Sequence, residues 1–293
     1  LMEIDKSIEI IPAHILTPYF GVLGSKSGFN SLEECYQEKT KHIHSVETGL
    51  SADPKMLWRL PFLDKISLIS GSDSHSFWPW RIGREATLFD IEQPLYENII
   101  KALRTKQGLK ATVEVDPSYG IYHFDGHRNC NISFSPQESL KYKNICPRCH
   151  KPLTIGVMHR IEELATRKEG YKPIDALPFY SLLPLAELIA LSNKSPLMSK
   201  KNLELFYKLV NRFDSEFNIL LNVPEHELIK DSNQKLASII INNRFGKIQV
   251  KAGYDGVYGV PIIDGESAPI KEYNDSKEEQ ITKKKIQKSL TEF

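Results

Sequence analysis

An Asp-x-His motif is the feature most suggestive of chemistry: Asp73 and His75 follow directly on a short apolar run, residues 66–70. The run contains β-branched residues and stops at Gly71, which favours a buried strand that ends there. Residues just past the C-terminal end of a strand lie where α/β barrels keep their catalytic groups. A carboxylate oxygen and an imidazole nitrogen suit Zn²⁺, Mn²⁺ or Fe²⁺. The motif therefore predicts a divalent-metal site, and a solvated turn is the alternative.

Two further short runs end in potential metal ligands. Residues 8–10 form a strand-like run followed closely by His14, and residues 45–49 carry Glu47 near the end of another run. Loop or helical sequence separates these runs from each other and from the Asp-x-His motif. We therefore expect His14 and Glu47 to join that motif at successive strand ends.

A second constellation combines His127 and Cys130 with Cys146 and Cys149. Each pair has the spacing of a zinc ribbon or knuckle, in which a tight turn offers both ligands to one tetrahedral ion. Thiolates and imidazole favour Zn²⁺ by softness and geometry. Because all the ligands come from one short stretch and no acid–base partner is evident, the pattern predicts a structural zinc site.

Alternatives to this ligand set stay open. His123 competes with His127 for the fourth position, and His150 is a weaker candidate. A disulfide framework is disfavoured, because three clustered cysteines and a distant Cys35 pair poorly. The absence of a secretory signal points the same way, since disulfides persist in oxidising compartments.

Composition sets wider limits on the class of protein. The 293 residues are enough for two domains, and 41% of them are hydrophobic. The formal net charge of +1 neither demands nor excludes nucleic acid, since local patches matter more than totals. Four cysteines without a signal sequence or a membrane-length apolar run predict a cytoplasmic protein with no membrane partner.

Around these ligands the sequence resembles the PHP (polymerase and histidinol phosphatase) superfamily of metal-dependent phosphoesterases, and within it the endonuclease Q family of DNA repair nucleases. The resemblance runs from Glu9 to Val260. It rests on unusual sequence motifs that occur in the same order as in the family: Pro12-Ala13-His14-Ile15-Leu16-Thr17-Pro18, Gly24-Ser25-Lys26-Ser27-Gly28-Phe29, Glu47-Thr48-Gly49-Leu50-Ser51 and Gly83-Arg84-Glu85-Ala86.

One departure from the family concerns its first strand. PHP domains open with a His-x-His motif, and none precedes His14. The His-x-His formed by His42 and His44 lies in an expected helix-to-strand connection. The resemblance thus implies that this chain lacks the N-terminal part of the PHP domain. We expect half of a metal site and weak or no activity from this chain alone.

The resemblance and the periodicities together predict an α/β fold. Its expected parts are a partial, distorted PHP-type (β/α) barrel over residues 1–119, a zinc-binding module over 120–156, a mainly helical C-terminal domain over 157–262 and a charged tail over 263–293. Helices are expected at 95–105 and from Val157 onward, a strand at 245–251 and a Gly-rich turn at 253–259.

The resemblance also implies a function: hydrolysis of the phosphodiester 5′ of deaminated bases (uracil, hypoxanthine, xanthine) or of abasic sites in DNA. His14, Glu47, Asp73 and His75 would hold Zn²⁺, Mn²⁺ or Mg²⁺ and carry the catalysis, with Asp73 also orienting the attacking water. Damaged DNA is the expected partner, and no protein partner in replication or repair can be named.

Four further residues are candidates for binding the substrate. Lys26 and Arg84 are candidate phosphate contacts, with a structural ion pair as the alternative for either, and Ser25 is a candidate substrate contact. Tyr258, in the Gly-rich turn, is a candidate for stacking on a base, with packing of the turn as the alternative. No Walker A motif occurs, so ATP-driven unwinding has no phosphate-binding loop to support it. The other functions considered are a PHP-type phosphomonoesterase and a non-catalytic DNA-binding fragment.

Overall fold

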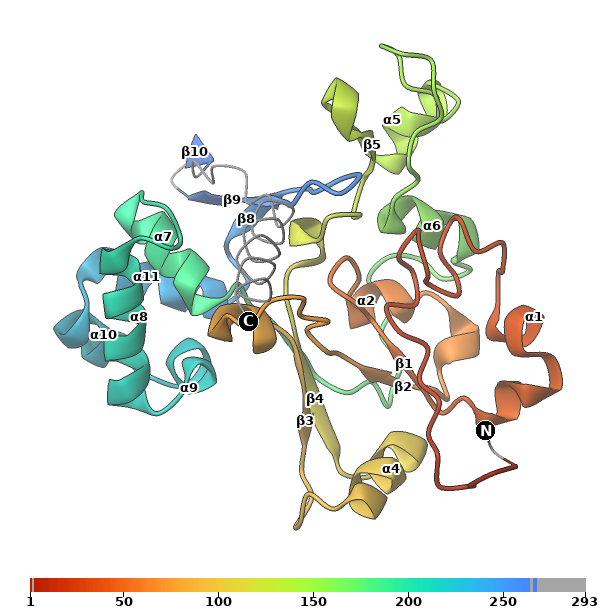
Figure 1. Ribbon diagram of the computed structural model, residues 1–293, viewed down its shortest axis with the longest axis horizontal. Helices are drawn as coiled ribbons and strands as arrows, with labels where there is room; N and C mark the ends of the chain where they lie inside the picture. The colour runs from red at the N-terminus through yellow and green to blue at the C-terminus, as the bar shows by residue number, and fades with distance from the viewer. Residues whose placement is uncertain (2, 264–265, 268–293) are drawn as a thin grey trace, which may run out of the picture.

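The computed structural model describes residues 1, 3–263 and 266–267 of the chain (Figure 1). Its N-terminal part contains α1 (Leu32–Tyr36), β1 (Ser45–Glu47), α2 (Pro54–Leu57), β2 (Ser67–Ile69), α3 (Pro79–Ile82), β3 (Ala86–Phe89), α4 (Tyr96–Thr105) and β4 (Leu109–Glu114). The middle part contains β5 (Asp125–His127), β6 (Ile132–Phe134), α5 (Pro136–Lys141) and α6 (Val157–Leu164). The last part contains β7 (Phe179–Ser181), α7 (Leu185–Asn193), α8 (Lys200–Phe213), α9 (Glu216–Leu221), α10 (Glu225–Asp231), α11 (Gln234–Arg244), β8 (Gln249–Lys251), β9 (Val260–Ile263) and β10 (Glu266–Ser267).

The strands of the N-terminal part form two small sheets. Strands β1 and β2 pair in parallel, whereas β3 pairs antiparallel to β4, and β4 pairs in parallel with β7 from much later in the chain. Within the described residues these sheets do not close into a barrel. The fold is thus mixed α/β with a helical C-terminal region, and the barrel expected over residues 1–119 is not closed.

The expected strand at residues 8–10 is wrong, because this run is irregular. The chain reaches the edge of β1 only afterwards, where the Pro12 carbonyl accepts from the Glu47 N–H at 3.0 Å and the Ile15 N–H donates to the Glu47 carbonyl at 3.0 Å. Proline has no N–H to donate, so a regular ladder cannot continue through it. His14 therefore sits in a loop against the end of β1.

Two large apolar cores and a smaller cluster around Ala102 and Leu103 of α4 organise the described residues. The first packs residues of the N-terminal loops, such as Ile15 and Leu23, against Leu57 of α2 and Ile161 of α6. The second contains the buried faces of α7 to α11 and extends to Trp80 of α3. Helix α6 therefore belongs with the N-terminal part, and α3 reaches from that part into the helical one.

Capping residues fix where the helices of the C-terminal region begin, and apolar stripes fix which of their faces are buried. Pro184 and Pro224 stand at the N-caps of α7 and α10, where a missing N–H costs nothing, and the Asn233 side chain caps α11. These helices gather on one side of the molecule, away from β5 and α5, as Figure 1 shows. None of the described helices is long and apolar enough to cross a membrane.

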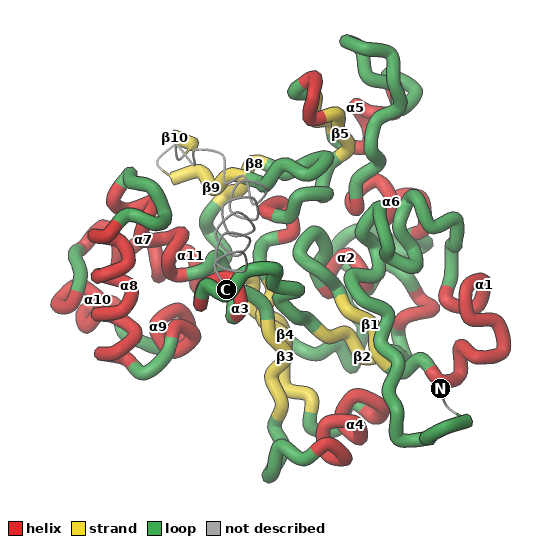
Figure 2. Tube along the Cα trace, viewed as in Figure 1, coloured by secondary structure: helices red, strands yellow, loops and turns green. Residues whose placement is uncertain are grey.

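The Gly-rich turn at 253–259 links the C-terminal sheet to the middle part. The Phe124 N–H donates to the Gly253 carbonyl at 2.9 Å, and Asp255 accepts from the Arg128 N–H at 2.7 Å and the Thr154 hydroxyl at 2.7 Å. Figure 2 shows that loops connect most of the short elements here. These hydrogen bonds therefore hold the base of the Cys/His segment in place.

Candidate metal centres

The Cys/His segment forms a compact set of ligands. His127 ends β5, Cys130 closes a 3-10 turn (Arg128–Cys130), and Cys146 and Cys149 lie in the turn after α5. One ligand atom from each of the four residues lies within 4.8 Å of the others. Cys149 Sγ lies 3.4 Å from His127 Nδ1. The local hairpin of β5 and β6 and the reverse turn at 146–149 thus bring both pairs to one point.

The thiols of this cluster differ in acidity. Burial opposes ionisation of Cys146, but the N–H groups of Cys149 and Arg148 and the neighbouring thiols lower its pKa to about 6. Burial and the two other thiols raise the pKa of Cys130 to about 11. The Cys146 thiolate is therefore favoured near neutral pH, whereas Cys130 keeps its proton until a cation arrives. Three sulfurs and one imidazole nitrogen are a donor set that fits a structural Zn²⁺.

The two other histidines considered lie outside this set. The His123 ring is buried against Phe124, with ring centroids 5.3 Å apart, and its Nδ1 lies 3.4 Å from the Ser51 carbonyl. His150 is exposed, and its N–H donates to the Cys146 carbonyl at 2.9 Å. His127 is thus the histidine that the structure places with the three cysteines, and His123 contacts the N-terminal part instead.

The second candidate centre lies at the ends of β1 and β2. The His14 N–H donates to Glu47 Oε2 at 2.8 Å, and His14 Nδ1 lies 2.8 Å from the Thr17 hydroxyl. His14 and Asp73 both have positive φ, 30° and 41°. Such backbone is uncommon outside glycine and is concentrated at functional sites. The contorted loops that carry these residues are therefore held by the surrounding structure.

The pKa of the Glu47 carboxyl group is affected by both His14 and Asp73. Burial raises its pKa, the N–H and ring of His14 lower it, and the negative charge of Asp73 raises it again, with a net upward shift. His14 and Asp73 thus both act on Glu47. His75 Nε2 lies 3.6 Å from Asp73 Oδ1, and the side chains of His75 and Asp73 are 84% and 56% exposed. Because burial makes the negative charge of Glu47 costly, a cation bound beside this carboxylate would compensate that charge in place of a proton.

The four residues of this second centre are less tightly gathered than the Cys/His cluster. Among the described residues, the Cys/His cluster is the one group of three or more potential ligands whose atoms all lie within 4.8 Å. The structure brings His14 to Glu47 and leaves the Asp73–His75 pair on the exposed rim. The assignment of these four as ligands stays a prediction.

Two glycines make the approach of these loops possible. Gly49 has φ of +75°, and a Cβ there would lie 2.7 Å from the Cβ of His14. A Cβ at Gly71 would lie 2.9 Å from Glu47 Oε1. Both glycines therefore give the backbone room beside a candidate ligand. In the sequence, the position of these glycines directly after the two strand-like runs is the feature that could have indicated this close approach.

A pair of buried glutamates lies beneath this centre and was not anticipated. Glu85 accepts from the Ser70 hydroxyl at 3.0 Å and the Val115 N–H at 3.1 Å. Glu114 accepts from the hydroxyls of Thr48 at 2.9 Å and Thr112 at 2.6 Å. Burial raises the pKa of Glu114 to about 7, and burial together with the charge of Glu114 raises that of Glu85 well above its usual value.

These glutamates support the ends of β1 and β2, because Thr48 follows Glu47 and Ser70 ends the run before Gly71. A signal for Glu114 was present, since it interrupts the otherwise apolar end of the run 109–115. A charged residue within such a run needs partners when it is buried.

The predicted substrate-binding residues lie in different settings. Lys26 is exposed, whereas Ser25 donates to the Ile155 carbonyl at 3.0 Å. Arg84 is buried and donates through Nε and Nη2 to the Ser72 carbonyl at 3.4 and 3.1 Å, directly before Asp73. Tyr258 packs against Tyr119, with ring centroids 5.5 Å apart. Arg84 thus positions the Asp73 loop, and phosphate contacts by these residues stay predictions.

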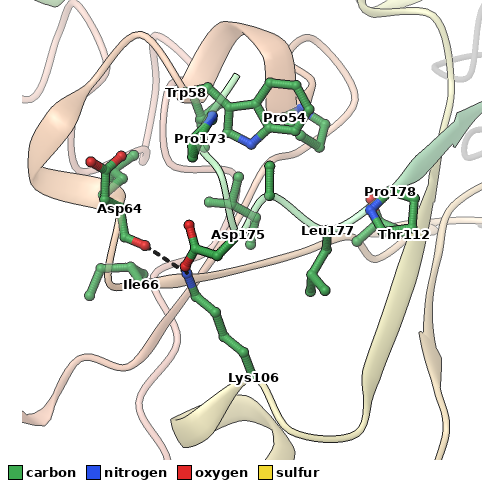
Figure 3. Close-up of a pocket in the computed structure, with 14 residues that line it drawn as sticks. Pro54, Trp58, Asp64, Ile66, Lys106, Thr112, Pro173, Asp175, Leu177 and Pro178 are labelled. Carbon is green, nitrogen blue, oxygen red and sulfur yellow. Dashed lines mark hydrogen bonds and ion pairs between the residues drawn. The ribbon is translucent and has the colours of Figure 1, made fainter. Parts of the chain in front are cut away.

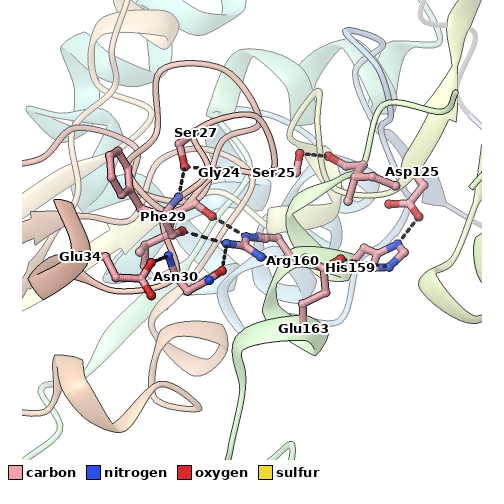
Figure 4. Close-up of polar contacts among 12 residues, drawn as sticks. Gly24, Ser25, Ser27, Phe29, Asn30, Glu34, Asp125, His159, Arg160 and Glu163 are labelled. Atoms are coloured by element: carbon pink, nitrogen blue, oxygen red, sulfur yellow. Dashed lines mark hydrogen bonds and ion pairs between the residues drawn. The ribbon is translucent and has the colours of Figure 1, made fainter.

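Helix α6 contacts both Asp125 of β5 and the loop that follows His14 (Figure 4). His159 Nδ1 and Asp125 Oδ2 form a short contact of 2.5 Å, and Asp125 Oδ1 accepts from the Gly156 N–H at 2.7 Å. Arg160 donates to the carbonyls of Leu23 at 2.7 Å and Phe29 at 2.8 Å. His159 therefore holds Asp125 of β5, and the next residue, Arg160, holds the loop after His14.

A hollow between α2, β2 and the segment 173–178 is separate from both centres (Figure 3). It has an empty volume of about 520 Å³, partly open to solvent, and is lined mainly by apolar residues of α2, β2 and the segment 173–178. Lys106 Nζ donates to the Asp64 carbonyl at 2.6 Å and lies 3.5 Å from Asp175. None of the predicted metal ligands lines it.

Comparison with known proteins finds one matching family model and two similar proteins. Residues 184–247 match the family described as the MJ0043 C-terminal domain. The chain is 33% identical over 236 residues to the uncharacterized protein MJ0043 of Methanocaldococcus jannaschii, covering 79% of this chain and 29% of that protein. It is 29% identical over 252 residues to the uncharacterized protein YqxK of Bacillus subtilis, covering 85% of this chain and 59% of that protein.

Two solved structures are similar over most of the chain. The lesion-specific endonuclease PfuEndoQ from Pyrococcus furiosus has a TM-score of 0.80 and 30% identity, covering 89% of this chain and 64% of that chain. Endonuclease Q in complex with a 27-mer duplex that carries an abasic lesion at the active site has a TM-score of 0.80 and 29% identity, covering 91% of this chain and 66% of that chain. The chain spans less than two thirds of the length of each of the two uncharacterized proteins and of each of the two solved chains. Over about nine-tenths of its length, the chain is a structural homologue of endonuclease Q, which confirms the family indicated by its sequence.

Proposed function

We propose that this chain is part of a metal-dependent DNA endonuclease that hydrolyses the phosphodiester 5′ of a deaminated base or an abasic site. The observation that carries the proposal is the similarity, at a TM-score of 0.80, to an endonuclease Q structure that holds an abasic duplex at its active site. The His14, Glu47, Asp73 and His75 group at the ends of β1 and β2 supports it from within this chain.

His14, Glu47, Asp73 and His75 would hold the catalytic metal. A bound divalent cation supplies a water of lowered pKa and stabilises the charge that develops on the leaving oxygen. Thr17 sets the tautomer of His14: its hydroxyl lies 2.9 Å from the His14 carbonyl and 3.0 Å from the Tyr19 carbonyl. The hydroxyl therefore donates its one proton to a carbonyl and accepts from Nδ1–H, which leaves Nε2 of His14 available as a ligand.

The Cys/His segment would supply part of the DNA contact. Exposed cations outnumber acidic groups around the four ligands, namely Arg128, Lys141, Lys143, Arg148 and Lys151 against exposed Glu138. Phosphate contacts of this kind provide sequence-independent affinity and bring a duplex to the enzyme. A structural Zn²⁺ held by His127, Cys130, Cys146 and Cys149 would keep these cations in a fixed arrangement.

The test is nicking of labelled duplexes that contain uracil, hypoxanthine or an abasic site, in the presence of Mg²⁺ or Mn²⁺, with an undamaged duplex alongside. The expected result is weak or no cutting by this chain alone and one cut 5′ of the lesion by a longer form that includes a His-x-His strand before His14. In that longer form, Asp73→Ala should give no cut and Asp175→Ala an unchanged cut. Asp175 lies in the separate hollow and serves as the matched control. Lesion binding without a cut would favour a DNA-binding role, and hydrolysis of p-nitrophenyl phosphate instead of DNA would favour a phosphomonoesterase.

A further inference from the structure

The segment that carries Asp73 and His75 also presents an aromatic ring to solvent. Asp73, His75 and Phe77 are exposed, whereas the residues between them, Ser74 and Ser76, are half-buried. Phe77 is 75% exposed, which is unusual for so large an apolar side chain only two residues from a candidate ligand. The exposed rim of the second centre therefore combines metal-binding groups with one aromatic face.

Phe77 is the outer end of an aromatic stack. Its ring centroid lies 4.9 Å from that of Trp78, whose ring stacks on Trp80 at 5.0 Å and an interplanar angle of 11°. Trp80 is fully buried and meets Phe206 of α8 edge-on at 5.6 Å. The buried Trp80 Nε1 has no hydrogen-bond partner among the described residues, so ring packing holds this indole in place.

This arrangement orients Phe77 before any ligand arrives. One side of the ring leans on Trp78, and the stack continues into the core of the helical region. A ring that is already held loses little conformational entropy when a second flat group stacks on it. Stacking of a base on an aromatic side chain contributes about 1–3 kcal/mol and tolerates any base, because every base has a π-face.

We propose that Phe77 stacks on a nucleobase face that the DNA lesion uncovers. The inference rests on the proposed function, since it takes damaged duplex DNA as the ligand. Bases inside an intact duplex are covered on both faces by their neighbours, whereas an abasic site leaves the flanking bases with an open face. Phe77 lies beside Asp73 and His75, so a base stacked on it sits next to the groups that would act on the neighbouring phosphate.

The experiment measures binding of two fluorescein-labelled duplexes by anisotropy in an Asp73→Ala background, which prevents cutting. One duplex carries an abasic site and the other is undamaged. Phe77→Ala should weaken binding of the abasic duplex by about 5- to 150-fold, with a much smaller effect on the undamaged one. Phe77→Trp should retain the affinity, and Phe77→Leu should lose most of it. Phe245, 66% exposed at the end of α11, is the matched control, and Phe245→Ala should have no effect.

A second readout reports stacking directly. 2-Aminopurine placed beside the abasic site should be quenched on binding by the protein with Phe77 and brighter with Phe77→Ala at saturating protein. If the starting protein prefers the abasic duplex and Phe77→Ala changes neither affinity nor quenching, this inference alone is overturned. Equal losses on both duplexes, or an equal loss in Phe245→Ala, also overturn it. If the starting protein does not prefer the abasic duplex, the proposed function fails together with the inference.

Discussion

The Cys/His cluster and the group at the ends of β1 and β2 are two candidate metal centres built in opposite ways. The first draws its ligands from two tight turns of one short segment, and they lie within 4.8 Å of one another. The second takes His14 from a loop, Glu47 from β1 and Asp73 with His75 from the loop after β2. Local turns suffice to assemble the first centre, whereas the second depends on strand pairing and on glycines that let loops approach.

Electrostatic support differs in the same way. The Cys146 thiol owes its lowered pKa to N–H groups of its own turn. Glu47 instead depends on residues distant in the sequence. The His14 N–H donates to its carboxylate, and the adjacent Thr48 donates to the buried Glu114. A change far from the second centre should therefore disturb it, while the first should respond mainly to changes in its own turns.

The largest effect is expected from Cys146→Ser. Structural zinc in such modules is bound with about 10–16 kcal/mol, which is also folding energy for the module. We expect the wild-type protein to bind about one Zn²⁺ per chain in this cluster, Cys146→Ser to lose it, and the distant Cys35→Ser to keep it. Elemental analysis of purified protein measures this, and zinc content unchanged in Cys146→Ser would rule out this ligand set.

In a longer form that includes a His-x-His strand before His14, Asp73→Ala should lower nicking by roughly a thousandfold, because the metal and its water contribute several kcal/mol to the reaction. The zinc of the Cys/His cluster should be retained, since Asp73 lies outside that cluster. Single-turnover nicking of an abasic duplex, combined with elemental analysis, tests both halves. Retained cutting by a preparation free of contaminating nuclease would remove Asp73 from the centre.

Thr17→Val should reduce the affinity of the second centre for its metal by about 10- to 100-fold, the usual effect of losing a group that orients a ligand. The physical reason is the loss of the hydroxyl that lies 2.8 Å from Nδ1 of His14 and orients its ring. Titration of nicking with Mn²⁺ measures the shift in half-saturation, and Thr17→Ser, which keeps the hydroxyl, should stay near wild type. Equal behaviour of the Val and Ser variants would show that the hydroxyl is dispensable.

Glu114→Gln should change the pH dependence of stability. The folded-state pKa of Glu114 is raised to about 7 from 4.5, so the stability linked to its neutral form is fully present below pH 4.5 and is lost as pH rises through about 7. We expect Glu114→Gln to flatten this decline and to stabilise the protein at pH 8 by about 1–3 kcal/mol. Urea unfolding from pH 5 to 8 measures it, with exposed Glu97→Gln as the control. A decline as steep as that of wild type would contradict the assignment.

Several local elements were predictable because their signals are short-range. The apolar runs before Glu47 and Gly71 predicted strands, and the structure confirms β1 and β2 there. Helical spacing predicted α4 and α6. The run before His14 looks similar in sequence, yet Pro12 cannot donate to a neighbouring strand, and no regular strand forms.

The sequence by itself determined the Cys/His cluster, because two ligand pairs with short spacing can meet through local turns alone. It also determined which carboxylates and imidazoles stand after strand-like runs. Only the tertiary structure decided that His127 joins the cysteines while His123 packs near Ser51. It likewise decided that Glu85 and Glu114 share one buried layer and that Trp80 fixes the stack ending in Phe77. The physical reason is that burial, charge coupling and ring stacking depend on distances between segments far apart in the chain, which no local pattern encodes.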